Sequence, residues 1–371
     1  MPSQHAEIEE LQIKLAEHEM SYLAAGPTDG PPVIFVHGWP ELGHSWRHQL
    51  PVLGGLGFRA IAPDLRGHGK STCYDQHGDF TMEKHTGDLI ALLDTLDHDR
   101  AIWVGHDWGA PIVWTIASHH PERCHGVANL CVPYRVLDNG LDGAVAQVDR
   151  GIYPFDQFPA GQWEYQYFYQ ENFARALNVF EANPRNTIKA LFRKWSPDDR
   201  GKPAITANVR NDNGWLGGVD VFPDMPRDDD VISADDLDTY VSALNRTGFF
   251  GSCSFYMNHE ENEKFSASVT NDGYIDMPVL FLVASYDYVC ECVDSDLPKP
   301  MREYCRNLTE RTVNSGHWMA QEKPVDVNSA LVQWLATALP QSWPKRRSTS
   351  EKGIRPAMPP RGAPRKSKPL Y

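Results

Sequence analysis

Residues 105–109 read Gly-His-Asp-Trp-Gly, a glycine-flanked turn that holds a carboxylate where such turns commonly hold a serine nucleophile. An apolar run at residues 101–104 precedes the turn, and a helix-compatible segment at residues 110–119 follows it. This strand, turn and helix form the arrangement of a nucleophile elbow, in which a strained central residue needs neighbours without a Cβ atom. We therefore expect Asp107 to stand exposed at the end of a strand.

The carboxylate limits the chemistry of this turn. An aspartate with the usual pKa of about 4 is an anion at neutral pH, so it can attack an electrophilic carbon without a base. Attack at saturated carbon forms an alkyl ester that water can hydrolyse, whereas a serine would form a stable ether. The turn thus favours opening of a C–O or C–halogen bond over acyl transfer. Taken alone, the five residues are also compatible with a simple Asx turn.

A second loop suits an oxyanion site. Residues 37–40, His-Gly-Trp-Pro, end an apolar stretch and open a segment rich in turn residues. Water attacking an aspartyl ester produces a tetrahedral oxyanion, which backbone N–H groups can stabilise. The N–H groups of Trp39 and Trp108 are the candidates, and Gly38 would let the two backbones approach closely.

A histidine and an acid farther along the chain complete a candidate relay. His317 follows the last predicted strand and a glycine, and the chain order nucleophile, acid, histidine makes it the candidate base for activating water. Asp287 follows the predicted strand at residues 279–284 and is the candidate partner that fixes the tautomer of His317. By chemistry alone, Asp294 and Asp296 remain alternatives to Asp287.

Short apolar runs alternate with helix-length segments, which predicts an α/β fold with a mostly parallel central sheet flanked by helices. The predicted strands are residues 32–37, 59–62, 101–104, 127–132, 279–284 and 309–313. Residues 8–23 fit either an acidic amphipathic helix or a hairpin, and the hairpin is favoured. The predicted domains are a core at residues 1–133 and 273–340, an inserted helical cap at 134–272, and a basic tail at 341–371.

The predicted cap contains aromatic-rich, helix-compatible stretches at residues 161–181, 186–194 and 233–247. Ligands of open α/β sheets bind at the carboxyl ends of the strands, so helices inserted there would bury the cleft over Asp107. A tyrosine hydroxyl in such a cleft can donate a hydrogen bond to a leaving oxygen. The candidate donors are Tyr165, Tyr167, Tyr169 and Tyr256.

Composition narrows the class of partner. The chain has 371 residues, 41% of them hydrophobic, and no apolar run approaches the roughly 18 residues of a membrane helix. Residues 345–371 carry nine basic side chains and one acid, so the formal net charge of −14 leaves about −22 on the other residues. An acidic body argues against nucleic-acid binding and favours a neutral, apolar small molecule over an anion.

Cysteine usage and the chain ends predict a cytoplasmic protein. Seven cysteines are scattered without a Cys-x-x-Cys pair, which favours free thiols over disulfides or a zinc site. The first 25 residues carry charges throughout, unlike a signal peptide. The basic, proline-rich tail is expected to be disordered, and its basic run at residues 345–347 leaves a nuclear-targeting role open. No cofactor or metal is expected, and a homodimer is one option for the oligomeric state.

Together these motifs resemble the α/β-hydrolase fold and, within it, the soluble-type epoxide hydrolases, over roughly residues 25–340. The resemblance rests on residues 37–40, Asp-Leu-Arg-Gly-His-Gly at 64–69, the elbow at 105–109, Asp287, and Gly-His-Trp at 316–318. Two cap segments, residues 165–170 and residues 247–251 with 255–258, resemble the family segments that hold the ring-opening tyrosines. The resemblance implies that Tyr165 and Tyr256 are that pair.

The activity implied by the resemblance is hydrolysis of an epoxide to a vicinal diol, with water as the second substrate and no cofactor. Asp107 would form the ester, and His317 with Asp287 would activate water. A haloalkane dehalogenase is the enzymatic alternative, although that family usually places a halide-binding asparagine where this chain has Trp39. A ligand-binding relative without turnover is a third option. The Ser-Phe pair at residues 254–255 departs from the family's frequent Asn-Trp, which bears on the pocket shape.

Overall fold

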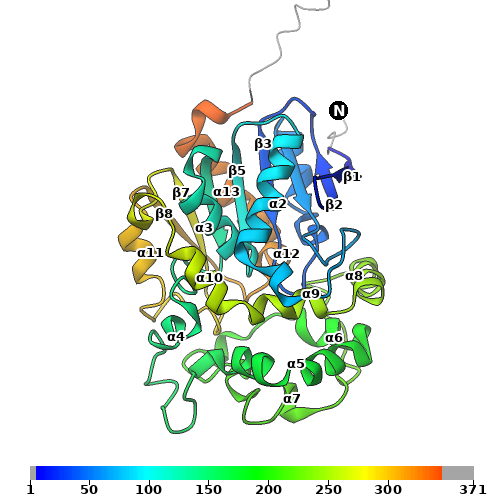
Figure 1. Cartoon of the computed structure of the whole chain (residues 1–371), viewed down its shortest axis with the longest axis vertical. Helices are drawn as coiled ribbons and strands as arrows, with labels where there is room; N and C mark the ends of the chain where they lie inside the picture. Colours follow the sequence, from blue (N-terminus) through cyan, green and yellow to red (C-terminus); the bar gives the residue numbers. More distant parts are fainter. Residues whose placement is uncertain (1–5, 345–371) are drawn as a thin grey trace, which may run out of the picture.

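The computed structural model describes residues 6–344, in which eight strands form one sheet and a group of helices lies beyond one end of it (Figure 1). The strands are β1 (Ile8–Lys14), β2 (Glu19–Ala25), β3 (Pro32–Val36), β4 (Arg59–Pro63), β5 (Ala101–His106), β6 (Cys124–Leu130), β7 (Val279–Ala284) and β8 (Leu308–Val313). Their order is β1-β2-β4-β3-β5-β6-β7-β8, antiparallel from β1 to β4 and parallel elsewhere. The predicted α/β fold with a mostly parallel sheet is confirmed.

The predicted strands correspond to β3 through β8, and their ends shift by at most three residues. Strands β3, β4, β5 and β7 are buried at every position, which explains why they are continuous apolar runs in the sequence. The N-terminal hairpin is also confirmed, because β1 pairs antiparallel with β2 from Ile8 opposite Ala25 to Lys14 opposite Glu19.

The order of the strands determines where a ligand can bind. β3 lies between β4 and β5, so the chain passes from β3 to one side and then crosses to the other side for β5. The carboxyl ends of β3 and β5 therefore border the crevice at which α/β sheets of this kind bind ligands. Val36 at the end of β3 pairs with Gly105 near the end of β5, so the loop at residues 37–40 and Asp107 emerge side by side.

Helices cover the sheet and extend beyond it. Those that belong to the connections around the sheet are α1 (Leu50–Gly55), α2 (Met82–Thr95), α3 (Gly109–His119), α11 (Lys299–Tyr304), α12 (Met319–Glu322) and α13 (Pro324–Ala338). α3 packs on β5 and β6 and also contacts α2. α13 begins with a proline in its first turn, where the missing N–H of proline costs no helical hydrogen bond.

The segment between β6 and β7 holds the remaining helices. They are α4 (Gly140–Val145), α5 (Glu164–Ala182), α6 (Pro184–Leu191), α7 (Trp215–Gly218), α8 (Ala234–Thr247), α9 (Phe250–Ser254) and α10 (His259–Ser266). Figure 1 shows α5, α6 and α7 below the sheet. The three helical stretches predicted here correspond to α5, α6 and α8. α8 begins with a capping box in which Ser233 Oγ accepts the N–H of Asp236 and Asp236 accepts the N–H of Ser233.

The predicted tail begins within the described residues. Ser342 is buried, and the Trp343 ring packs edge-on against Phe58 with 5.4 Å between centroids. The rest of the predicted tail, including the basic run at residues 345–347, lies outside the described residues. Each of the seven cysteines is a free thiol. Across residues 6–344, no helix combines the length and the apolar character needed to cross a membrane.

Candidate active site

Asp107 lies in the turn between β5 and α3 with a φ of +50°, in the left-handed region where a non-glycine residue is strained. The flanking glycines are required by packing. A Cβ atom on Gly105 would lie 2.5 Å from Asn129 Oδ1, and one on Gly109 would lie 2.1 Å from the carbonyl oxygen of Val36. The turn thus has the strained conformation that the glycine spacing predicts, and the side chain of Asp107 remains 15% exposed.

Two backbone amides converge on the carboxylate of Asp107. The Trp39 N–H donates a hydrogen bond to Asp107 Oδ1 over 2.5 Å. A Cβ atom on Gly38 would lie 2.3 Å from the same oxygen and 2.5 Å from the Trp108 nitrogen, so both loops meet at this point. The geometry suits an oxyanion bound between the two predicted N–H donors.

Gly38→Ala is expected to lower kcat by about 10²–10³-fold, the usual cost of losing one oxyanion donor. The substrate for this test is an epoxide, the class that the family resemblance implies. The added methyl group would overlap the carboxylate and the Trp108 amide, so one loop must move. Steady-state kinetics measures the loss of kcat, and urea unfolding measures any loss of stability caused by the movement of the loop. Gly87→Ala in α2 is the matched control, because a Cβ there meets no atom within 4 Å and a helical alanine is favourable. Equal losses in the two variants would contradict the prediction.

His317 connects the nucleophile to a buried acid. Its Nδ1 lies 2.6 Å from Asp287 Oδ2 and its Nε2 lies 3.4 Å from Asp107 Oδ2. The other carboxylate oxygen of Asp287 accepts the N–H groups of Val289 and Cys290 over 3.1 and 3.0 Å. Two backbone amides thus hold Asp287 in place beside His317 Nδ1, the contact that its candidate role requires.

The alternative acids have other environments. Asp294 is exposed and pairs with Arg200 over 2.7 Å, and no hydrogen bond or ion pair among the described residues joins Asp294 or Asp296 to His317. Among the described residues, Asp287 is thus the one of these three acids that contacts His317.

Charge stabilises the relay. Burial disfavours the charged form of His317, but the negative charge of Asp287 and a hydrogen bond to Asp107 outweigh it and raise its pKa well above the usual range. Burial likewise opposes the charge on Asp287, and the proximity of His317 nevertheless lowers the pKa of Asp287. Both shifts favour an imidazolium beside a carboxylate.

Two of the candidate tyrosines lie together over the elbow. Tyr165 is in the first turn of α5, and Tyr256 follows α9 in a 3₁₀ turn at Phe255–Met257. Their ring centroids are 5.4 Å apart, and the Tyr256 ring lies edge-on to Trp108 at 5.1 Å. Burial raises the pKa of both tyrosines, which keeps their hydroxyl protons in place at neutral pH.

The other two tyrosines have different surroundings. Tyr169 is also close to Tyr256, at 4.7 Å between ring centroids, but its oxygen accepts the indole N–H of Trp215 over 2.9 Å. Tyr167 donates its hydroxyl proton to Asp142 over 2.7 Å on the surface. Of the four candidates, the structure thus brings Tyr165, Tyr169 and Tyr256 together and separates Tyr167 from them.

Aromatic rings line the junction between the elbow and the inserted helices. Trp39 stacks on Trp215 at 6.2 Å and packs edge-on against Phe180 at 5.5 Å. Trp108 stacks on Phe255 at 5.4 Å. Such walls exclude water and strengthen the hydrogen bonds made inside the crevice.

A buried ion pair supports the site and was not predicted from the sequence. His106 Nδ1 lies 2.8 Å from Glu41 Oε2, which also accepts the Gly38 N–H over 3.0 Å, and His106 Nε2 lies 2.8 Å from the carbonyl oxygen of His317. Glu41 overcomes the effect of burial and raises the pKa of His106 well above its usual range. The pair connects the loop at residues 37–40, the elbow and the loop that holds His317. A signal was available, because His106 lies within the elbow and Glu41 directly follows the loop at residues 37–40.

Metal-capable side chains occur together at one place within residues 6–344. His106, Cys131 and His317 have ligand atoms within 4.8 Å of one another. The nitrogens of His106 are engaged by Glu41 and the His317 carbonyl, and Nδ1 of His317 is engaged by Asp287. The Cys131 thiol donates to the His317 carbonyl over 3.3 Å. Hydrogen bonding therefore accounts for the cluster.

Three other buried histidines are neutral in the folded protein. Burial lowers the pKa of His37 to about 4, of His68 to about 3 and of His259 to about 4. His37 Nε2 accepts the Leu65 N–H over 3.0 Å, which requires an unprotonated nitrogen. Protonating these rings inside the fold is costly, so acid favours the unfolded chain.

The free energy of unfolding is expected to fall as the pH drops below about 6.5. Unfolded histidines gain a proton near that pH, whereas His37, His68 and His259 resist it until near pH 3–4, so stability is lost progressively over this window. His106 and His317 have raised pKa values and act in the opposite direction above about pH 6, whereas below it they are charged in both the folded and the unfolded chain. Between pH 6 and 5 the three depressed groups therefore cost about 3 kcal/mol of the free energy of unfolding. Urea unfolding at pH 6 and 5 measures this loss, and equal free energies of unfolding at the two pH values would contradict it.

Comparison with known proteins shows which family the chain is similar to. A family model described as alpha/beta hydrolase fold matches residues 31–324. Epoxide hydrolase A of Mycobacterium tuberculosis is 32% identical over 84% of this chain and 92% of its own length. Bifunctional epoxide hydrolase 2 of Rattus norvegicus is 30% identical over 84% of this chain and 52% of its own, so the chain spans about half of that protein.

A solved structure is similar over nearly the whole described chain. The crystal structure of epoxide hydrolase A from Mycobacterium thermoresistibile matches with a TM-score of 0.73 at 28% sequence identity, covering 89% of this chain and 99% of that one.

Proposed function

The chain belongs to the epoxide hydrolases of the α/β-hydrolase fold, and we propose that it hydrolyses an epoxide to a vicinal diol through an ester on Asp107. One observation carries the proposal. The carboxylate of Asp107 lies between the Trp39 N–H at 2.5 Å and His317 Nε2 at 3.4 Å, at the crevice that Tyr165 and Tyr256 border. A carboxylate nucleophile, a base and two hydroxyl donors are the groups that ring opening followed by ester hydrolysis needs.

The first step is ring opening. Asp107 Oδ1 is held by the Trp39 N–H, so Oδ2 attacks the epoxide carbon and forms the new C–O bond. The ring C–O bond breaks, and its electron pair goes to the epoxide oxygen, which takes a proton from Tyr165 or Tyr256. The raised pKa of these buried tyrosines means that the proton moves only to a strong base such as the departing alkoxide.

The second step is hydrolysis of the ester. Ester formation removes the negative charge of Asp107, which helps to hold the proton on His317, so the imidazolium gives up its proton and, through water, the tyrosinate left by ring opening regains its hydroxyl. Neutral His317 then takes a proton from water as the water attacks the ester carbonyl. The Trp39 and Trp108 N–H groups stabilise the oxyanion, and its collapse breaks the acyl C–O bond as His317 returns the proton to the leaving diol; the new carboxyl group of Asp107 then protonates His317 and restores the starting state.

We further propose that residues 134–272 act as a cap domain and that the substrate is neutral and largely apolar. The aromatic contacts of Trp39 and Trp108 with residues of this segment support a dry, enclosed reaction site. A cytoplasmic location is also a proposal, supported by the seven free thiols, which suit a reducing compartment.

A single-turnover experiment in ¹⁸O-labelled water tests the proposed function. With enzyme in excess over styrene oxide, the first-turnover diol should contain unlabelled oxygen, because the new oxygen comes from the Asp107 carboxylate. Label in the diol of the first turnover would contradict the covalent mechanism. Halide release from haloalkanes, without diol formation from epoxides, would instead favour the dehalogenase alternative.

Tyr165→Phe and Tyr256→Phe are each expected to slow ring opening by about 10²-fold, since each removes a donor to the leaving oxygen. Stopped-flow tryptophan fluorescence reports this step, because Trp108 lies 5.1 Å from the Tyr256 ring. Tyr167→Phe is the matched control, as its hydroxyl is engaged by Asp142 on the surface. An unchanged ring-opening rate in both site variants would remove the tyrosines from the mechanism.

A further inference from the structure

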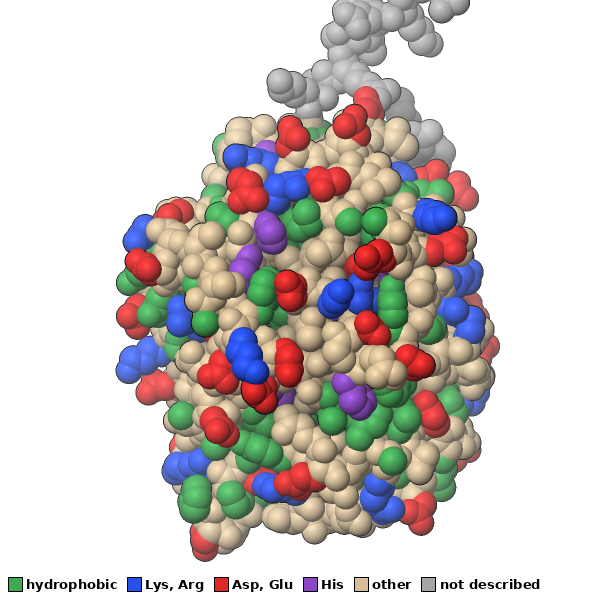
Figure 2. Space-filling view, in the orientation of Figure 1, with side chains coloured by type: hydrophobic (Ala, Val, Ile, Leu, Met, Phe, Trp, Pro, Cys, Tyr) green, Lys and Arg blue, Asp and Glu red, His purple; other side chains and the backbone are tan. Residues whose placement is uncertain are grey.

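Gln166 makes an unusual contact next to the reacting groups. Its Nε2 atom donates a hydrogen bond to the hydroxyl oxygen of Tyr165, the preceding residue, over 3.0 Å. Side chains of adjacent residues on a helix do not face each other, so the helix by itself does not produce this bond. Polar side chains are abundant on the surface that Figure 2 shows, but Gln166 is only 1% exposed. The surrounding packing therefore holds its amide group against Tyr165.

Gln166 does not have the usual structural role of a glutamine at its position. It is the third residue of α5, where a glutamine side chain commonly accepts the N–H of the residue before the helix, here Trp163. Its Oε1 atom is buried and has no hydrogen-bond partner among residues 6–344. An unpartnered carbonyl oxygen inside a protein reduces stability and needs an explanation. Gln166 thus contributes an N–H donor to Tyr165 at the expense of stability.

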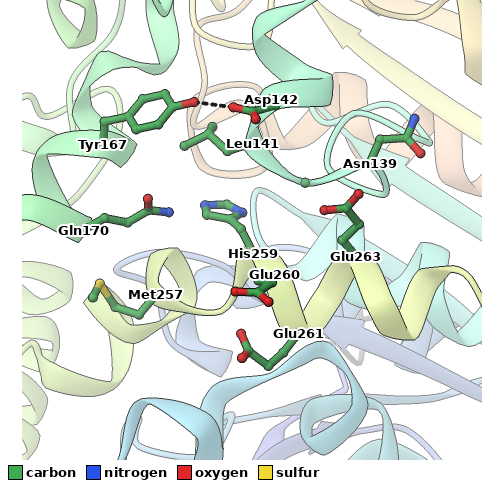
Figure 3. Close-up of a pocket in the computed structure, with 11 residues that line it drawn as sticks. Asn139, Leu141, Asp142, Tyr167, Gln170, Met257, His259, Glu260, Glu261 and Glu263 are labelled. Atoms are coloured by element: carbon green, nitrogen blue, oxygen red, sulfur yellow. Dashed lines mark hydrogen bonds between the residues drawn. The ribbon is translucent and has the colours of Figure 1, made fainter.

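The direction of this hydrogen bond leaves the proton of Tyr165 available. A tyrosine hydroxyl carries one proton and accepts through its lone pairs, so an oxygen that accepts the Gln166 N–H keeps its own proton for another acceptor. Tyr167, in the same turn of α5, has the opposite arrangement. Figure 3 shows its hydroxyl group directed at Asp142, to which it donates over 2.7 Å. Of these two tyrosines, Tyr165 is thus the one prepared to protonate a leaving oxygen.

The same hydrogen bond gains strength as an epoxide opens. When Tyr165 gives its proton to the leaving oxygen, negative charge develops on its own oxygen, and an N–H group binds a charged acceptor more strongly than a neutral one. Burial raises the pKa of Tyr165, and the hydrogen bond from Gln166 opposes that rise. An interaction that is stronger in the transition state than in the ground state accelerates the reaction.

We propose that Gln166 is a positioning residue for ring opening, which directs the hydroxyl proton of Tyr165 toward the epoxide oxygen and stabilises the tyrosinate that remains. The inference rests on the proposed function. Gln166 acts on the substrate only through Tyr165, so its contribution should disappear when residue 165 lacks a hydroxyl group. Ester hydrolysis uses His317 and the N–H groups of Trp39 and Trp108, so this step should not depend on Gln166.

Gln166→Met tests the proposal, because methionine is similarly long and flexible but has no N–H donor. Ring opening of styrene oxide, followed by stopped-flow tryptophan fluorescence, should be about tenfold slower than in the wild type, the loss expected for one hydrogen bond to a developing charge. The later return of the fluorescence, as the ester hydrolyses, should keep its rate. Urea unfolding should show a stability equal to or above that of the wild type, because the variant also removes the unpartnered Oε1 atom.

Double variants separate a positioning role from a purely structural one. Gln166→Met should cause no further slowing of ring opening in Tyr165→Phe, but the full tenfold slowing in Tyr256→Phe. Gln162→Met is the matched control and should keep the wild-type rates. Gln162 is also buried with an unpartnered Oε1 atom, and no hydrogen bond among the described residues joins its side chain to either tyrosine.

The kinetics distinguish failure of this inference from failure of the proposed function. Unchanged or faster ring opening in Gln166→Met would overturn the role of Gln166, and so would equal slowing with and without the Tyr165 hydroxyl group. A wild-type protein that forms no ester with styrene oxide would instead overturn the proposed function, and this inference with it.

Discussion

Asp107→Ala is expected to lower kcat for epoxide hydrolysis by at least about 10⁴-fold and to leave no covalent intermediate. In the proposed mechanism both steps pass through this carboxylate, since it provides the attacking oxygen and then the carbonyl that water attacks. No other carboxylate replaces it, because Asp287 is enclosed with an exposed side-chain fraction of 0% and is bound to His317. Steady-state diol formation, followed by chromatography, measures the loss.

Asp97→Ala is the matched control for this variant. Asp97 is exposed at the end of α2 and has a φ of +60°, close to the +50° of Asp107, so alanine meets the same backbone strain there. We expect both variants to lose a similar, small amount of stability, and only Asp107→Ala to lose activity. Activity within tenfold of the wild type in Asp107→Ala would contradict the assignment of the nucleophile.

His317→Gln is expected to stop the reaction at the ester. Ring opening needs the carboxylate and the tyrosines, whereas hydrolysis needs the base, so the variant should react once and then turn over about 10²–10⁴-fold more slowly than the wild type. Intact-mass spectrometry after mixing with styrene oxide should show one added substrate mass per chain. Peptide mapping should locate this mass on the peptide that contains Asp107.

A surface histidine provides the control for the His317→Gln experiment. His120 is half-buried after α3 and pairs with Glu122 at 3.8 Å, remote from the relay, so His120→Gln should turn over normally without accumulating an adduct. An unmodified His317→Gln protein that has nonetheless lost activity would show that His317 acts before the ester forms, which would contradict its role as the hydrolytic base.

Local patterns in the sequence were sufficient for much of the fold. The buried strands are visible as unbroken apolar runs because both faces of the parallel sheet are covered. The start of α8 is visible because Ser233 and Asp236 form a capping box within four residues. Asp107 could be identified as a nucleophile candidate because its strained turn requires glycines at fixed positions.

Long-range geometry decided the rest of the site. Asp294 and Asp296 are alternatives to Asp287 by chemistry alone, but the fold buries Asp287 against His317. Tyr165 and Tyr167 lie in the same turn of α5, and helix rotation turns one inward and the other toward Asp142 on the surface.

The sequence by itself pointed to Asp107 as the candidate nucleophile, to the strands around it and to the class of bond that a carboxylate there would break, because each depends on residues within one short segment. The tertiary structure decided which acid and which supporting charges surround it, and it brought three of the four candidate tyrosines together there. Glu41 and His106 are 65 residues apart in the chain, yet their atoms lie 2.8 Å apart behind the elbow. Contacts of this kind depend on how separate segments pack, and the spacing of residues along the chain does not reveal that packing.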